Sequence, residues 1–186
     1  MTLIELPEHA LRAARDGRLS VLLLPIEPQP RSDVTAFIPD GAHWRPCLVF
    51  GSYASIQSPY KPGDVLGVQE EWCDIDYPTE ETIYAIDGRL TFLNWSPPSE
   101  IPEHAVRTWL TVVAVTPVLA QDVRLGDVIG CGVWDMNWAV DHTINQKHSN
   151  WMSEFLRLMG ETYPSLGDNP WLWKIDLHQP AQQRGH

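Results

Sequence analysis

The 186-residue chain is 44% hydrophobic and 20% charged, which is enough apolar sequence to bury a core within one domain. Its 13 Lys and Arg against 24 Asp and Glu give a net charge of −11. A protein that binds long duplex nucleic acid is expected to be positively charged instead, because its surface contacts many phosphates. No apolar run approaches the roughly 20 residues of a membrane span, and the N-terminal residues lack the pattern of a secretion signal. We therefore expect a cytoplasmic protein that neither enters a membrane nor covers a long polymer.

Cysteine and histidine spacing gives no sign of a metal or a disulfide framework. Cys47, Cys73 and Cys131 are odd in number and far apart, so we expect free thiols. The seven histidines form neither a His-Glu-x-x-His motif nor an i, i+4 pair. A glycine-rich phosphate loop is also missing, and we expect no cofactor.

The first fifty residues combine one helix with short strands. Pro7–Gly17 has Pro in the first turn, helix formers inside and Gly at the end, which predicts a helix. Val21–Leu24 is an apolar run that ends at a proline, which is typical of a strand. The stretch Arg31–Arg45 is rich in turn residues and weakly patterned, and the apolar Cys47–Phe50 is a candidate second strand.

The middle of the chain predicts strands and a hairpin. Apolar alternation after the turn Pro62–Asp64 predicts a strand that runs toward Trp72. Tyr84–Phe92 is predicted as a hairpin, because its Asp-Gly pair suits a two-residue turn. Trp109–Val118 is dense in β-branched residues and is the clearest strand.

The C-terminal part predicts one helix and one more strand. Trp151–Met159 places apolar residues at helical spacing. Trp171–His178 alternates cleanly, which predicts a half-buried strand that closes the fold. The polar residues 179–186 are predicted to form a disordered tail.

These elements predict an α+β fold that is mainly β, a compact barrel with two or three short peripheral helices. We expect a single domain over residues 1–178. The segments 31–58 and 134–168 are expected to be loop and helix embellishments on it.

Several short motifs follow one another in a distinctive order along nearly the whole chain. A helix ending in Gly-Arg is followed by Pro-Gln-Pro, Tyr-Lys-Pro-Gly-Asp-Val-Leu, Glu-x-Trp, Trp-x-Pro, Ala-x-Arg, Gln-Asp-Val and Asn-Pro-Trp-x-Trp. The residues of these motifs are Gly17, Arg18, Pro28–Pro30, Tyr60–Leu66, Glu70, Trp72, Trp95, Pro97, Pro102, Ala105, Arg107, Gln121–Val123 and Asn169–Trp173. This order resembles that of the ASCH-domain proteins of bacteriophages and prophages. The resemblance implies a PUA-like β-barrel that binds RNA or a modified nucleobase, with N4-acylcytidine hydrolysis in some small members.

The chain departs from that family at the positions that carry its chemistry. Where the amidohydrolase members are thought to use a Lys and a Thr, this sequence has Leu19 and Leu22, and Cys131 falls where their Glu would stand. Leucine supplies neither a nucleophile nor a proton shuttle. Two arginines of the family are replaced by Leu23 and Leu24. The resemblance therefore implies no amidohydrolase activity and no catalytic residues of that scheme.

Three residues are the leading candidates for a ligand pocket. Glu70 and Trp72 lie two apart on a predicted strand, so they share a side and offer an acceptor and a stacking face. Arg107 could bind a phosphate or a carboxylate with two hydrogen bonds. The alternative is structural: Trp72 in the core, and Glu70 and Arg107 paired with charges of the chain itself.

Three further residues complete the candidate set. Lys61, in the Pro-Gly-Asp turn, is a possible contact or catalytic cation, or simply a solvated lysine. Tyr84 is a possible pocket aromatic or a core residue. Ser20 is a possible replacement for a lost catalytic residue.

Cys131 has no neighbouring base and is expected to be a buried thiol. The acids between Gln69 and Gly88, seven in number, are expected to form a solvated loop rather than a calcium site.

The leading hypothesis is a non-enzymatic protein that binds a nucleotide, a modified nucleoside or a short single-stranded RNA in one pocket. Two alternatives stay open. The first is an acidic interaction module that acts on a protein of the bacterial host. The second is a ribonuclease-like or amidase-like hydrolase in which Lys61, Ser20 or Glu70 replaces the lost residues.

Overall fold

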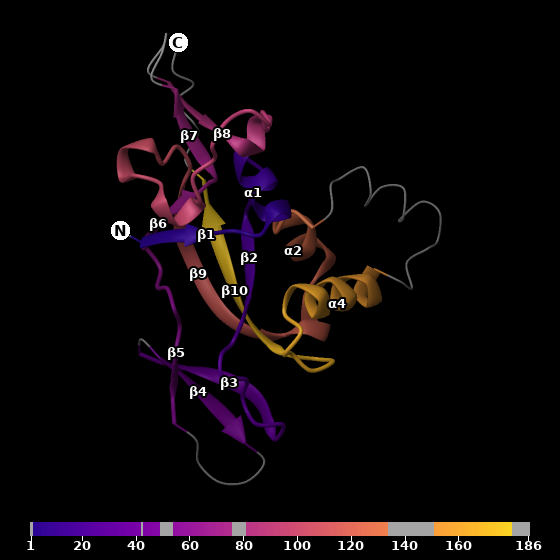
Figure 1. The fold of residues 1–186 in the computed structure, drawn as a ribbon. Coiled ribbons are helices and arrows are strands. Elements are labelled where there is room, and N and C mark those ends of the chain that lie inside the picture. Colours follow the sequence, from indigo (N-terminus) through magenta and orange to yellow (C-terminus); the bar gives the residue numbers. More distant parts are fainter. Residues whose placement is uncertain (1, 42, 49–53, 76–80, 134–150, 180–186) are drawn as a thin grey trace.

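The computed structural model describes residues 2–41, 43–48, 54–75, 81–133 and 151–179 (Figure 1). A five-stranded sheet has the order β1-β6-β9-β10-β2. Its strands are β1 (Thr2–Glu5), β6 (Val65–Gln69), β9 (Trp109–Leu119), β10 (Trp171–His178) and β2 (Val21–Pro25). β1 runs parallel to β6, whereas the other neighbouring pairs are antiparallel. The mainly β, α+β fold class is therefore confirmed, with a mixed sheet at its centre.

The sheet does not close into the predicted barrel. β1 and β2 are its two outer strands, and no pairing within the described residues joins one to the other. A closed barrel requires every strand to have two hydrogen-bonded neighbours. The strand β10, predicted to close the fold, lies instead between β9 and β2.

Both faces of the sheet near β10 are buried, which explains its central place. Trp171, Trp173 and Ile175 pack in a cluster with the helix α1 (Glu8–Arg15), through alanines of that helix. Leu172 points to the opposite face and packs with Phe155 in the helix α4 (Trp151–Thr162). The short helix α2 (Leu125–Gly130) covers this second face as well (Figure 1). The predicted helices at the N-terminus and at Trp151 are thus confirmed.

A second, three-stranded antiparallel sheet corrects the expectation of a loop over residues 31–58. It consists of β3 (Val34–Asp40), β4 (His43–Leu48) and β5 (Ile56–Gln57). Phe37 packs edge-on against Trp171 with ring centroids 4.7 Å apart, which attaches this sheet to the main core. Residues 49 and 50 of the predicted strand Cys47–Phe50 lie outside the described residues.

The hairpin predicted over Tyr84–Phe92 is wrong. The antiparallel pair is formed earlier, by β7 (Trp72–Ile75) and β8 (Glu81–Tyr84), with Trp72 opposite Tyr84. Ala85–Asp87 form a 3-10 helix, η1, and Gly88 follows with φ 148°. The described residues form three more 3-10 turns: η2 (Pro98–Glu100), η3 (Glu103–Ala105) and η4 (Ala120–Asp122). The strand predicted to run to Trp72 is therefore two strands, β6 and β7.

The last described residue, Gln179, is bonded to α1. Gln179, assigned to the predicted disordered tail, donates from Nε2 to the backbone oxygen of Ala14 in α1, over 2.8 Å. Residues 180–186 lie outside the described residues. Among the helices that the structure describes, none is long and apolar enough to cross a bilayer.

Candidate functional site

Glu70 and Arg107 meet because β6 and β9 are antiparallel neighbours. Glu70 directly follows β6 and Arg107 precedes β9, and a backbone hydrogen bond from Val68 to Thr108 (3.0 Å) aligns the two segments. Arg107 donates from Nε to Oε1 of Glu70 over 3.1 Å and from Nη2 to Oε2 over 2.8 Å. Glu70 is only 1% exposed, so this two-pronged ion pair is the charged centre of a buried cluster.

Two other residues complete the surroundings of Arg107. The Nη1 of its guanidinium donates to Asp87, at the end of η1. The same group lies over the ring of Tyr84, with Cζ 3.8 Å from the ring centroid. The Tyr84 hydroxyl in turn donates to the backbone oxygen of Ala105. The structure therefore brings together the candidates Glu70, Arg107 and Tyr84, and adds Asp87.

The electrostatics of this cluster keep Arg107 charged. Burial of the guanidinium disfavours its charged form, but the hydrogen bonds to Glu70 and Asp87 outweigh burial and raise the pKa of Arg107. Burial also raises the pKa of the Tyr84 hydroxyl. Both oxygens of Glu70 are occupied by Arg107, so the pair is suited to holding strands and η1 in place. This agrees with the structural alternative for Glu70 and Arg107.

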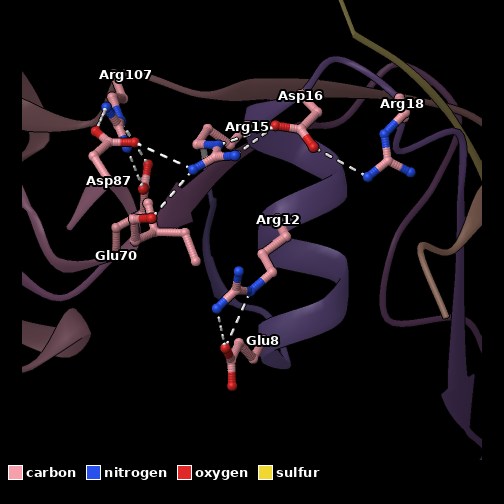
Figure 2. Close-up of polar contacts among 9 residues, drawn as sticks. Glu8, Arg12, Arg15, Asp16, Arg18, Glu70, Asp87 and Arg107 are labelled. Atoms are coloured by element: carbon pink, nitrogen blue, oxygen red, sulfur yellow. Dashed lines mark hydrogen bonds and ion pairs between the residues drawn. The ribbon is translucent and has the colours of Figure 1, made fainter. Parts of the chain in front are cut away.

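A chain of ion pairs links this cluster to α1 (Figure 2). Arg15 lies 3.8 Å from Asp87 and donates to the backbone oxygen of Ile86 over 3.2 Å. Arg15 also pairs with Asp16, which accepts a further bond from Arg18. The helix is thus attached to η1 by charges at its C-terminal end.

Trp72 packs beside the ion-pair cluster in a small apolar core. It contacts the buried group of Ile101, Ala105 and Val106, together with Tyr84. The Nε1 donor of Trp72 is buried and has no hydrogen-bond partner among the described residues. The structural alternative, a core role, is thus what the structure shows for Trp72.

A groove of about 400 Å³ lies next to this cluster, beside the ends of β1 and β6. One wall is formed by α1, with Arg12, and the other by η1 and the residues that follow it, with Arg89. The complete lining is Glu5, Leu6, Glu8, Leu11, Arg12, Gln69, Glu71, Ala85, Ile86, Arg89 and Pro98. Its volume falls within the range of small-molecule sites.

The two arginines of the groove retain free donors. Arg12 pairs with Glu8 through Nε and Nη2, and Arg89 pairs with Glu71 through Nη1 and Nη2. Their side chains are 58% and 60% exposed, and such exposed pairs contribute little stability. The Nη1 of Arg12 and the Nε of Arg89 bond to none of the described residues. Both arginines can therefore turn to an anion in the groove.

Lys61 and Ser20 lie away from these contacts. Lys61 is in the turn before β6, at the opposite end of that strand from Glu70, and its backbone N–H donates to Asp64. Ser20 lies against the end of α2, where its N–H donates to the backbone oxygen of Gly130 over 2.9 Å. The contacts described for this part of the chain join neither residue to Arg107.

The three positions where the resemblance places lost catalytic groups are buried. Leu19 and Leu22 are core residues, 2% and 3% exposed. Cys131 is 5% exposed, and burial raises the pKa of its thiol to about 11. Leu22 and Cys131 line one small apolar cavity of about 40 Å³ between α1, β2 and α4. A largely protonated thiol among apolar side chains is inert, as expected from the sequence.

Sequence reasoning missed the groove itself. Its floor depends on the parallel pairing of Glu5 with Gln69, and its second wall depends on η1, which was predicted as a hairpin turn. One local signal was present, because Glu8 and Arg12 have the i, i+4 spacing of a helical ion pair.

The described residues contain no group of three or more His, Cys, Asp or Glu placed to hold a metal ion. No protein-family model, curated protein or solved structure matches the chain.

Proposed function

We propose that this protein binds a nucleotide or a nucleobase in the groove between α1 and η1, without transforming it. The observation that carries the proposal is the pair of exposed arginines, Arg12 and Arg89, on the two walls of a 400 Å³ groove. Free guanidinium donors suit a phosphate, and the apolar Leu6, Leu11 and Pro98 offer surface to a base. The sequence resemblance to ASCH-domain proteins supports the same class of ligand.

The proposal moves the ligand away from the ion pair that the sequence analysis favoured. Glu70 is buried and accepts two hydrogen bonds from Arg107, so a ligand that recruited Arg107 would leave this carboxylate buried without its partner. Their role is to fix Tyr84 and η1, and hence one wall of the groove. The apolar surroundings of Leu19, Leu22 and Cys131 support binding without catalysis.

Calorimetric titration with nucleoside monophosphates at low ionic strength tests this proposal. We expect measurable binding by the wild type and a loss of affinity of about tenfold or more in Arg89→Ala, because a hydrogen bond between charged groups is worth about 1.5–3 kcal/mol. Arg31→Ala is the matched control: Arg31 is 64% exposed, pairs with Asp33 and lies outside the groove. Equal affinity in both variants, or no binding at all, would refute the proposal.

A further inference from the structure

The charges that line the groove are not balanced. Glu8 pairs with Arg12 and Glu71 pairs with Arg89, which leaves Glu5 as the fifth charged residue of the lining. Within the described residues, Glu5 has neither a hydrogen bond to its carboxylate nor an ion pair. Glu5 therefore gives the groove an exposed carboxylate that has no partner among the described residues and that only accepts hydrogen bonds.

Strand register places a second acceptor beside that carboxylate. Glu5 is the register partner of Gln69 in the parallel pair of β1 and β6, so the two side chains leave the same face of the sheet about 4.8 Å apart. The Nε2 of Gln69 donates to the backbone oxygen of Pro98 over 3.2 Å. Because a carbonyl oxygen can only accept, the amide must present its nitrogen to Pro98. Its Oε1 then stays available.

The floor of the groove thus carries three oxygen acceptors on one face of the sheet, two from Glu5 and one from Gln69. A base that fits must offer several adjacent donors on one edge. Guanine does so, because its N1–H and its exocyclic N2 amino group lie side by side on the Watson–Crick edge. Adenine and cytosine offer one amino group beside an acceptor nitrogen, and uracil offers a single N–H between two carbonyl oxygens.

We infer that Glu5 and Gln69 select guanine. This inference rests on the proposed function, and it adds the identity of the base and the residues that read it. Glu5 accepts from N1–H and from one N2 hydrogen of the base, and Gln69 accepts from the other N2 hydrogen. Arg12 or Arg89 then holds the phosphate, which offsets the repulsion between a nucleotide and a chain of net charge −11.

Inosine monophosphate is the decisive probe, since it differs from guanosine monophosphate only by the missing N2 amino group. We expect the wild type to bind guanosine monophosphate about tenfold more tightly than inosine monophosphate, and adenosine monophosphate more weakly than either. In Glu5→Gln, the affinity for guanosine monophosphate should fall about tenfold or more, and the preference over inosine monophosphate should shrink. Glu27→Gln removes the same charge at an exposed site outside the groove and should leave the preference unchanged.

The outcomes separate this inference from the function on which it rests. Binding of all three nucleotides with equal affinity, reduced by Arg89→Ala, would overturn guanine selection and leave nucleotide binding intact. A preference for adenosine monophosphate, or a guanine preference unaffected by Glu5→Gln, would overturn it as well. No binding of any nucleotide by the wild type would overturn both proposals.

Discussion

Arg107 donates two hydrogen bonds to the two carboxylate oxygens of Glu70, and the carboxylate is almost completely buried beneath it. This pair joins the end of β6 to the start of β9. Through Asp87 and Tyr84 it also holds the segment that forms one wall of the groove.

Arg107→Ala should destabilise the fold by about 3 kcal/mol, because it leaves the carboxylate of Glu70 buried without a partner. Urea unfolding followed by tryptophan fluorescence measures this free energy. Arg31→Ala, which removes an exposed ion pair with Asp33, should cost less than about 1 kcal/mol. Similar losses in the two variants would contradict a structural role for the buried pair.

Glycine is required at position 132, where the end of α2 packs on α1. Its φ is +85°, and an added Cβ would lie 2.6 Å from Cβ of Ala13 and 2.7 Å from the backbone oxygen of His9. Gly132→Ala should therefore lower the free energy of unfolding by about 2 kcal/mol or more. Gly160→Ala, in α4 with no atom within 4 Å of the added carbon, should raise it by about 0.5–1 kcal/mol. Thermal melting distinguishes the two, and equal melting temperatures would contradict the packing.

Stability should depend on pH through His9. Burial lowers the pKa of His9, and the nearby Glu8 offsets this only in part. The unfolded chain therefore binds a proton that the folded chain releases, so the contribution is complete above about pH 6.5 and is lost as the pH falls below that value. The free energy of unfolding should fall less between pH 7.5 and pH 5 in His9→Gln than in the wild type. Identical pH profiles would exclude this role.

The three thiols should differ in reactivity. Cys131 is buried with its pKa raised to about 11, whereas Cys47 and Cys73 are partly exposed. At pH 8 a thiol reagent should modify the latter two in the native protein and reach Cys131 only after unfolding. Cys131→Ser should leave the number of thiols that react in the native protein unchanged. If this variant had one reactive thiol fewer, Cys131 would be accessible in the folded chain.

The sequence predicts the strands that are rich in apolar or β-branched residues and are buried by their neighbours, namely β2, β9 and β10. It also predicts α1, because the signals at the ends of this helix are local. β3 escaped prediction because most of its side chains are exposed. It is stabilised by β4 and by the contact between Phe37 and Trp171, which are distant in sequence.

In the candidate site, too, local patterns could be predicted and contacts between distant segments could not. The structure brings Glu70, Trp72, Tyr84 and Arg107 close together, but their contacts are with one another and with a small apolar core. Lys61 and Ser20, which were predicted with them, make their contacts elsewhere. The hairpin prediction was wrong because it relied on the Asp-Gly pair at 87 and 88. In the structure, the carboxylate of Asp87 binds Arg107, and η1 is present instead of the two-residue turn. The groove could not be predicted, because it depends on the parallel pairing of β1 with β6 and on two arginines far apart in sequence.

Backbone amide chemical shifts during a titration with guanosine monophosphate test the central claim, a nucleotide site in the groove, most directly. We expect saturable shift changes at residues 5–12, 69–71 and 85–89, and little change in β3 and β4. These changes should weaken in Arg12→Ala/Arg89→Ala. Shift changes centred on the cavity beside Cys131 and Phe155, or none at millimolar nucleotide, would contradict the account.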